Sequence, residues 1–146
     1  MIIHTTRFGN VEFQADDILT LPKGLVGYET EQYWVLLADE DNESIAWLQQ
    51  VARPELAMAV VSPRRFVPDY NLHVSSRQLE LLQLSPEASP YVLVVLSRNA
   101  DQLTINLRAP ILLNLQQRLG RQLLTLDEQP LQLAVARVDA RFKQTA

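Results

Sequence analysis

Residues 91–107 read YVLVVLSRNADQLTINL and contain two short apolar runs on either side of a turn. The first run, Val92–Leu96, is apolar throughout, which is the pattern of a central strand covered on both faces. The second, Leu103–Leu107, alternates apolar and polar residues and predicts a strand with one face in water. The intervening Asn99–Asp101 is rich in turn formers. This stretch therefore predicts strands rather than a helix.

Similar runs recur along the whole chain, and most have the length of a strand. Because so many sheet faces must pack on one another or close, we expect an all-β fold, mainly antiparallel, built as a barrel or a sandwich. The other runs are Val11–Phe13, Ile18–Leu21, Tyr33–Leu37, Ala46–Gln49, Ala57–Val61, Tyr70–Val74, Ile111–Leu115, Gln122–Leu126 and Leu131–Val135. Ala57–Val61 is apolar throughout, so we expect it to be central too.

One or two short helices interrupt this pattern. Ser75 and Gln78 have the spacing of a capping box, and the leucines of 79–84 would place an apolar stripe on the barrel. Ser85–Pro86 resembles a second helix start, but Pro90 leaves room for barely one turn.

Two glycines predict turns. Gly9–Asn10 is a two-residue hairpin signal, and Gly120 offers a positive φ between two strands. The chain has 146 residues, 47% of them hydrophobic, enough for one domain with a substantial core. We expect this domain to span residues 1–135, and we expect residues 136–146, with weak apolar content, to form a flexible segment.

The charge is distributed unevenly along the chain. Residues 1–73 hold 11 acidic and 5 basic residues, a net charge of −6, whereas residues 74–146 hold 6 acidic and 8 basic ones, a net charge of +2. Residues 29–52 contain no Lys or Arg. The pI of about 5.1 argues against direct binding of nucleic acid. With no cysteine, no signal-peptide pattern and no apolar run near the roughly 20 residues of a membrane span, we expect a cytoplasmic protein without membrane contact.

Little in the sequence points to catalysis. The two histidines, His4 and His73, lack a serine-nucleophile motif or metal-ligand spacing, and we interpret His73 as part of a strand. Adjacent carboxylates such as Asp16–Asp17 usually only keep a loop solvated. We therefore expect no enzyme, no catalytic residue, no metal and no cofactor.

Residues 63–70 favour recognition of a partner. Phe66, Pro68, Asp69 and Tyr70 lie in a segment with a second proline, Pro63, so the whole segment cannot be a central strand. Aromatic side chains on a proline-stiffened loop can anchor a partner. The equal alternative is that Phe66 and Tyr70 close one end of a barrel.

Several segments together resemble the flagellar assembly factor family FliW, over about residues 5–133. The longest is Ile18–Glu29, ILTLPKGLVGYE, and no single segment is decisive by itself. The others, in order, are Thr6–Gly9, Val11–Phe13, Trp47–Gln49, Phe66–Tyr70, Leu79–Leu84, Ile105–Ile111, Asn114 and Arg118–Gln122.

The resemblance implies a cytoplasmic bacterial protein with an antiparallel, barrel-like fold and no enzymatic activity. It implies two partners: flagellin, and the RNA-binding translational regulator CsrA. When flagellin is exported, the released protein would bind CsrA away from its RNA groove and relieve repression of flagellin translation. We expect the chain to act as a monomer.

An RNA-binding regulator carries basic surface, and an acidic partner gains association rate and specificity from complementary charge. Asp39, Glu40, Asp41 and Glu43 are therefore the candidate CsrA contacts, beside the alternative that they form an ordinary solvated loop. Two other functions stay open: a chaperone for flagellin export alone, and a small hydrolase that uses carboxylates in a barrel mouth.

Overall fold

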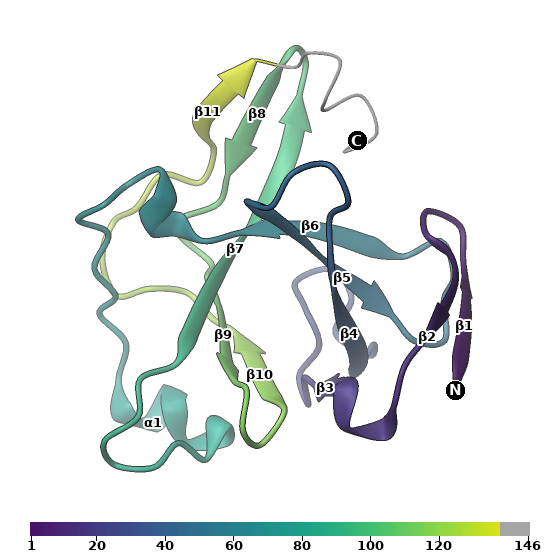
Figure 1. The fold of residues 1–146 in the computed structure, drawn as a ribbon. Helices are drawn as coiled ribbons and strands as arrows, with labels where there is room; N and C mark the ends of the chain where they lie inside the picture. The colour runs from purple at the N-terminus through teal and green to yellow at the C-terminus, as the bar shows by residue number, and fades with distance from the viewer. Residues whose placement is uncertain (138–146) are drawn as a thin grey trace.

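The computed structural model describes residues 1–137 of the 146-residue chain, and these residues form an all-β fold with one short helix. This confirms the predicted fold class and, of the two arrangements considered, the barrel (Figure 1). The strands are β1 (Ile2–Thr5), β2 (Gly9–Glu12), β3 (Ile18–Thr20), β4 (Tyr33–Ala38), β5 (Ile45–Gln50), β6 (Ala57–Val61), β7 (Tyr91–Asn99), β8 (Gln102–Ile105), β9 (Ile111–Asn114), β10 (Leu119–Gln122) and β11 (Leu133–Arg137). The helix is α1 (Ser76–Leu79), and single 3-10 turns cover Ala15–Asp17, Pro63–Arg65 and Glu80–Leu82.

Seven strands close into a barrel in the order β7-β6-β5-β4-β3-β10-β9, and the pairing of β9 with β7 completes the circle. All neighbours in this circle are antiparallel except β3 and β10, which are parallel and meet at Thr20 and Leu119. The predicted central strands, β6 and β7, lie next to each other in this sheet.

Strand β7 belongs to two sheets. Its first residues pair with β9, Val94 and Val95 pair with β6, and Leu96–Asn99 pair with β8. β11 adds to the far edge of β8, so β7, β8 and β11 project from the barrel at the top of Figure 1. The predicted turn joins β7 to β8, with Ala100 at a φ of 56°.

This projecting sheet corrects two expectations. Thr104 does not face water: it is 5% exposed, and its hydroxyl accepts a hydrogen bond from the amide of Asn99 at 2.6 Å. Residues 136 and 137 are the end of β11 rather than the start of a flexible segment. The expected flexibility of residues 138–146 lies outside the described residues.

The barrel interior is apolar. One face of β3, β4, β5, β6, β7 and β9 contributes to it, because alternate residues of a strand point to the same face. The buried members are Leu19, Leu21, Leu25, Trp34, Leu48, Leu56, Val60, Leu93, Ile111 and Leu113.

Gly120 serves this interior and not a turn. It lacks the predicted positive φ, and a Cβ there would lie 2.7 Å from Leu113 Cδ2 and 3.0 Å from Leu21 Cδ1. The positive φ of that hairpin, 57°, belongs to Arg118. Gly120 therefore allows β10 to approach its neighbours closely.

Three elements cover the outside of the barrel. The β1–β2 hairpin packs Ile3 and Phe13 on Val35 of β4, and the helical segment 76–82 packs Leu82 on Leu112 of β9. The segment after β6 brings Tyr70 onto the outer face of β5, β6, β7 and β8. These three elements bury the apolar side chains on the outer faces of the barrel strands.

Three local predictions have different outcomes. The capping box is confirmed, since the Ser75 hydroxyl accepts the Gln78 N–H and the Gln78 side chain accepts the Ser75 N–H. The two-residue turn at Gly9–Asn10 is wrong: both residues begin β2, and the loop is Thr6–Phe8 with Gly9 at a φ of 67°. Ser85–Pro86 begins a turn and no second helix.

Candidate functional site

The acidic loop, residues 39–43, joins β4 to β5, and Asp39 organises it. One carboxylate oxygen of Asp39 accepts the backbone N–H groups of Asp41 and Asn42, at 3.1 and 2.9 Å. The other accepts the indole N–H of Trp47 at 2.9 Å. Asp39 is therefore half-buried and used by the fold, which sets it apart from the other acidic residues of the loop.

A cluster of three side chains supports this loop. The guanidinium of Arg7 lies 4.3 Å from the centre of the Trp47 ring, a cation–π distance. Phe8 meets the same ring edge to face, with centroids 5.7 Å apart. The turn of the β1–β2 hairpin and the acidic loop are thus joined through one buried tryptophan, and the loop has a rigid base.

Glu40, Asp41 and Glu43 point their charges into solvent. All three are exposed, and none takes part in an ion pair within residues 1–137. By contrast, Glu31, from the same base-free stretch, forms an ion pair with Arg53 at 3.3 Å. The loop therefore carries three exposed carboxylates close together in sequence without an ion pair among the described residues.

The proline segment, residues 63–70, separates into exposed and buried parts. Phe66, Pro68 and Asp69 are exposed, with Phe66 at 37%. Tyr70 is 4% exposed, belongs to the outer core, and donates its hydroxyl to the carbonyl of Leu107 at 2.7 Å. The prediction that Tyr70 contacts a partner directly is therefore wrong, because almost none of its ring is accessible at the surface.

Burial of Tyr70 should appear in the pH dependence of stability. Burial, and then the charge of Asp127, raise the pKa of the Tyr70 hydroxyl from 10.0 to about 12. The unfolded chain loses this proton near pH 10 while the folded chain keeps it, so folding stability falls as the pH rises from 10 to 12. We expect Tyr70→Phe to weaken that fall, because phenylalanine cannot ionise. Urea unfolding at pH 9, 10 and 11 measures the free energy of unfolding of both proteins. An identical decrease of this free energy with pH in wild type and Tyr70→Phe would contradict the prediction.

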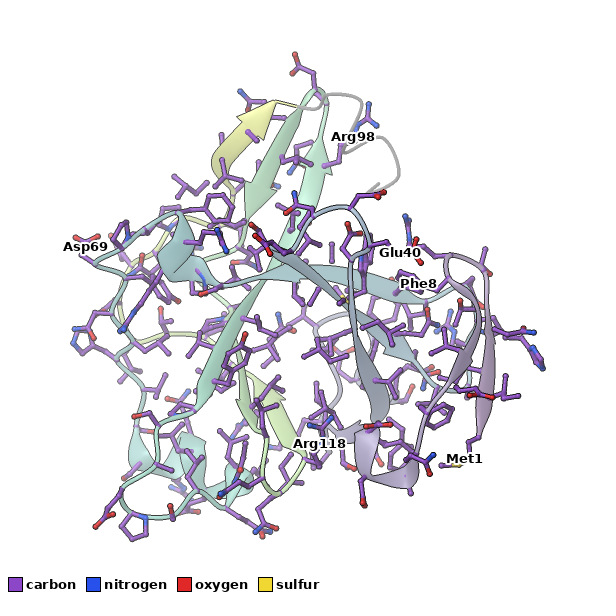
Figure 2. All side chains as sticks on the ribbon, viewed as in Figure 1. Met1, Phe8, Glu40, Asp69, Arg98 and Arg118 are labelled. Atoms are coloured by element: carbon purple, nitrogen blue, oxygen red, sulfur yellow. The ribbon has the colours of Figure 1, made fainter. Side chains whose placement is uncertain are left out.

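The two candidate segments do not form one site. Figure 2 shows Asp69 at the far left and Glu40 to the right of centre. Sequence reasoning gave no indication of this separation. It also missed Arg7, Phe8 and Trp47 as the support of the acidic loop, although all three lie in segments of the family resemblance.

The described residues offer little for acid–base or metal chemistry. The placement of His73 in a strand is wrong: it is exposed in the loop before α1, and its Nδ1 lies against a carboxylate oxygen of Asp127. Residues 1–137 contain no group of three His, Asp or Glu side chains that could hold a metal ion. The barrel interior holds apolar side chains where a hydrolase would need paired carboxylates. Nor do residues 1–137 include a helix long and apolar enough to cross a bilayer.

The fold and these surfaces define a small β-barrel with a projecting three-stranded sheet and a supported acidic loop. The FliW family model, described as FliW protein, matches residues 2–135. The chain therefore belongs to the FliW family of flagellar assembly factors.

Individual relatives agree with this. A flagellar assembly factor FliW of Bdellovibrio bacteriovorus is 36% identical over 124 residues, which cover 84% of this chain and 71% of that protein. One of Clostridium botulinum is 30% identical over 126 residues, covering 85% and 88%. A crystal structure of the flagellar assembly factor FliW superposes with a TM-score of 0.82 at 30% identity, covering 97% of this chain and 99% of the other.

Proposed function

We propose that this protein binds the translational regulator CsrA through its acidic loop, and that flagellin is its second partner. Bound flagellin would hold the protein away from CsrA, and its export would free the protein to relieve repression of flagellin translation. A cytoplasmic location, a monomeric state and the absence of direct contact with nucleic acid are parts of this proposal.

One observation supports the acidic loop as the CsrA contact. Glu40, Asp41 and Glu43 are exposed and lack an ionic partner within residues 1–137, on a loop that Asp39 and Trp47 hold in place. Charges on a preorganised loop lose little conformational freedom when a basic partner binds. They also accelerate association through the long-range field.

The test reverses the three free charges and keeps Asp39. We expect the Glu40→Lys, Asp41→Lys, Glu43→Lys variant to bind CsrA about tenfold more weakly at low salt, since each exposed ion pair contributes up to about 1 kcal/mol. The difference should shrink at high salt because exposed charges are screened. Calorimetry at two salt concentrations measures both effects.

The matched control reverses three exposed carboxylates elsewhere: Glu12, Asp16 and Glu87. It changes the net charge equally but leaves the loop intact, so CsrA affinity should stay close to that of the wild type. Equal weakening in both variants would show that only net charge matters, and unchanged affinity in the loop variant would reject the loop as the contact.

A pull-down separates this proposal from a chaperone for flagellin alone. Immobilised protein should retain purified CsrA in the absence of flagellin, and added flagellin should displace it. Retention of flagellin without any CsrA would favour the chaperone.

A further inference from the structure

A basic pocket lies at the end of the barrel opposite the projecting sheet, where α1 and β10 are seen in Figure 1. Its volume is about 350 Å³. Lys23 enters it from the turn after β3, Arg77 from α1 and Arg121 from β10. Among the residues that line it, only Glu80 carries a carboxylate, so the lining has a net charge of +2. The whole chain has a net charge of −4, so positive charge is gathered here against the balance of the molecule.

The cations of the basic pocket are not neutralised by the protein. Within residues 1–137 the side chains of Lys23 and Arg77 make no hydrogen bond and no ion pair, and both side chains are exposed. Glu80 forms no ion pair with any of the described residues either. Like charges without a counter-charge repel one another, so an anion in the pocket would stabilise this arrangement.

Arg121 is the most firmly held of the three cations. Its backbone pairs with Leu112 in the ladder between β9 and β10, and its Nη1 donates to the carbonyl of Gln78 at 2.9 Å. In the described part of the chain this is the only hydrogen bond of the guanidinium, and its Nε is buried without a partner. A buried N–H without an acceptor is rare in folded proteins. The guanidinium is therefore fixed beside the pocket and still has donors to offer to a ligand.

The other two cations also stand on fixed backbone. The turn that carries Lys23 is closed by the N–H of Gly24, which donates to the carbonyl of Leu21 at 2.8 Å. Arg77 lies inside the capping box that Ser75 and Gln78 form at the start of α1. The backbone that presents the three charges is thus in place before a ligand arrives, which lowers the cost of binding.

The charges and the size of the pocket indicate a phosphate monoester. Guanidinium and ammonium groups are the side chains that bind phosphate oxygens in proteins. A phosphate monoester presents three terminal oxygens and carries about two negative charges at neutral pH, which matches three cations and a net charge of +2. A single carboxylate would neutralise only half of that charge. The volume lies near the lower end of the roughly 300–1,000 Å³ of small-molecule pockets, so the ligand is a small one.

We propose that the basic pocket binds a small phosphate monoester, with its phosphate group between Lys23, Arg77 and Arg121. The pocket lies away from the acidic loop: α1 is at the lower left of Figure 1, and Glu40 is above and to the right of it in the same view in Figure 2. The proposal goes beyond the proposed function and does not depend on whether the protein binds CsrA or flagellin.

NMR titration of the full chain, labelled with ¹⁵N, tests this proposal. The probes are glycerol 3-phosphate and inorganic phosphate, added at constant ionic strength. We expect saturable shifts of the backbone amides of Arg77, Gln78 and Arg121. The Lys23→Gln, Arg77→Gln variant should bind glycerol 3-phosphate about tenfold more weakly, since it loses two of the three cations. Both side chains are exposed, and the spectrum of the variant shows directly that it is folded.

The matched control is Arg65→Gln, Arg98→Gln, which removes the same charge from two exposed arginines outside the pocket. Its affinity should equal that of the wild type. Equal weakening in the two variants would show that only net charge matters and overturns the proposal. Shifts that do not saturate, or that spread evenly over the molecule, overturn it as well.

The choice of probes distinguishes the sources of the phosphate group. Equal affinity for both probes supports a site that recognises phosphate alone, and tighter binding of glycerol 3-phosphate supports a site that also contacts the organic part. A short single-stranded RNA is the third probe. If it shifts the same amides and binds more tightly than either phosphate, the pocket belongs to a nucleic acid and the proposal of a small monoester is overturned.

Discussion

Replacing Gly24 with alanine is expected to lower the free energy of unfolding by about 3 kcal/mol or more, enough to unfold a marginal domain. Gly24 has a φ of +64°, and a Cβ there would lie 2.2 Å from the carbonyl oxygen of Tyr28 and 2.8 Å from backbone atoms of Glu29. Backbone atoms cannot rotate away as a side chain can. The turn must open, which would disturb Leu25, a member of the barrel interior.

Gly27, in the following turn, provides the control. Its φ is +86°, but a Cβ there would have no atom within 4 Å. Gly27→Ala should therefore cost only the conformational strain, about 1–2 kcal/mol. Urea unfolding of both variants measures the difference, and equal losses would show that the close approach at Gly24 relaxes without cost.

Tyr70→Ala is expected to cost about 3–5 kcal/mol, the range for removing a large aromatic side chain from a core. The loss includes the packing against the outer core and leaves the carbonyl of Leu107 without the Tyr70 hydroxyl. Phe66→Ala should cost about 1 kcal/mol or less, because the ring is partly exposed and outside the core clusters. Thermal unfolding of the two variants measures this contrast.

Binding experiments on these variants require a folded protein. At temperatures where both variants are folded, any loss of CsrA or flagellin binding in Phe66→Ala reports on a direct contact. A loss of binding in Tyr70→Ala reports first on a change of structure. Tyr70→Phe keeps the ring and should cost only about 1 kcal/mol for the lost hydrogen bond. A stable Tyr70→Ala with impaired binding would contradict the assignment of Tyr70 to the core.

The sequence predicted the fold class because strand periodicity and capping are local. The apolar run at 92–96 and the capping box at Ser75 depend on residues a few positions apart, and both appear in the structure as expected. Thr104 and Gly120 could not be predicted in the same way. Asn99 donates a hydrogen bond to Thr104, and Leu21 and Leu113 pack closely around Gly120. The surroundings of both residues therefore depend on side chains that the fold brings near.

The candidate site shows the same division. The exposed acidic residues could be found from composition, since charged side chains without bases around them usually stay in solvent. The structural role of Asp39 could not be predicted from the sequence, because its hydrogen-bond partner Trp47 lies on the next strand. Nor could the burial of Tyr70, whose partner Leu107 is 37 residues away.

By itself, the sequence determined that the chain folds as a β-protein, that its net charge is negative, and that it resembles the FliW family. Periodicity, composition and ordered motifs are properties of neighbouring residues, so they can be found without coordinates. Only the tertiary structure decided that the barrel closes through the pairing of β9 with β7, and that β7 then leaves β6. Strand pairing joins distant segments through backbone groups that every residue carries, and for this reason side-chain patterns alone do not specify where a sheet closes or where it opens.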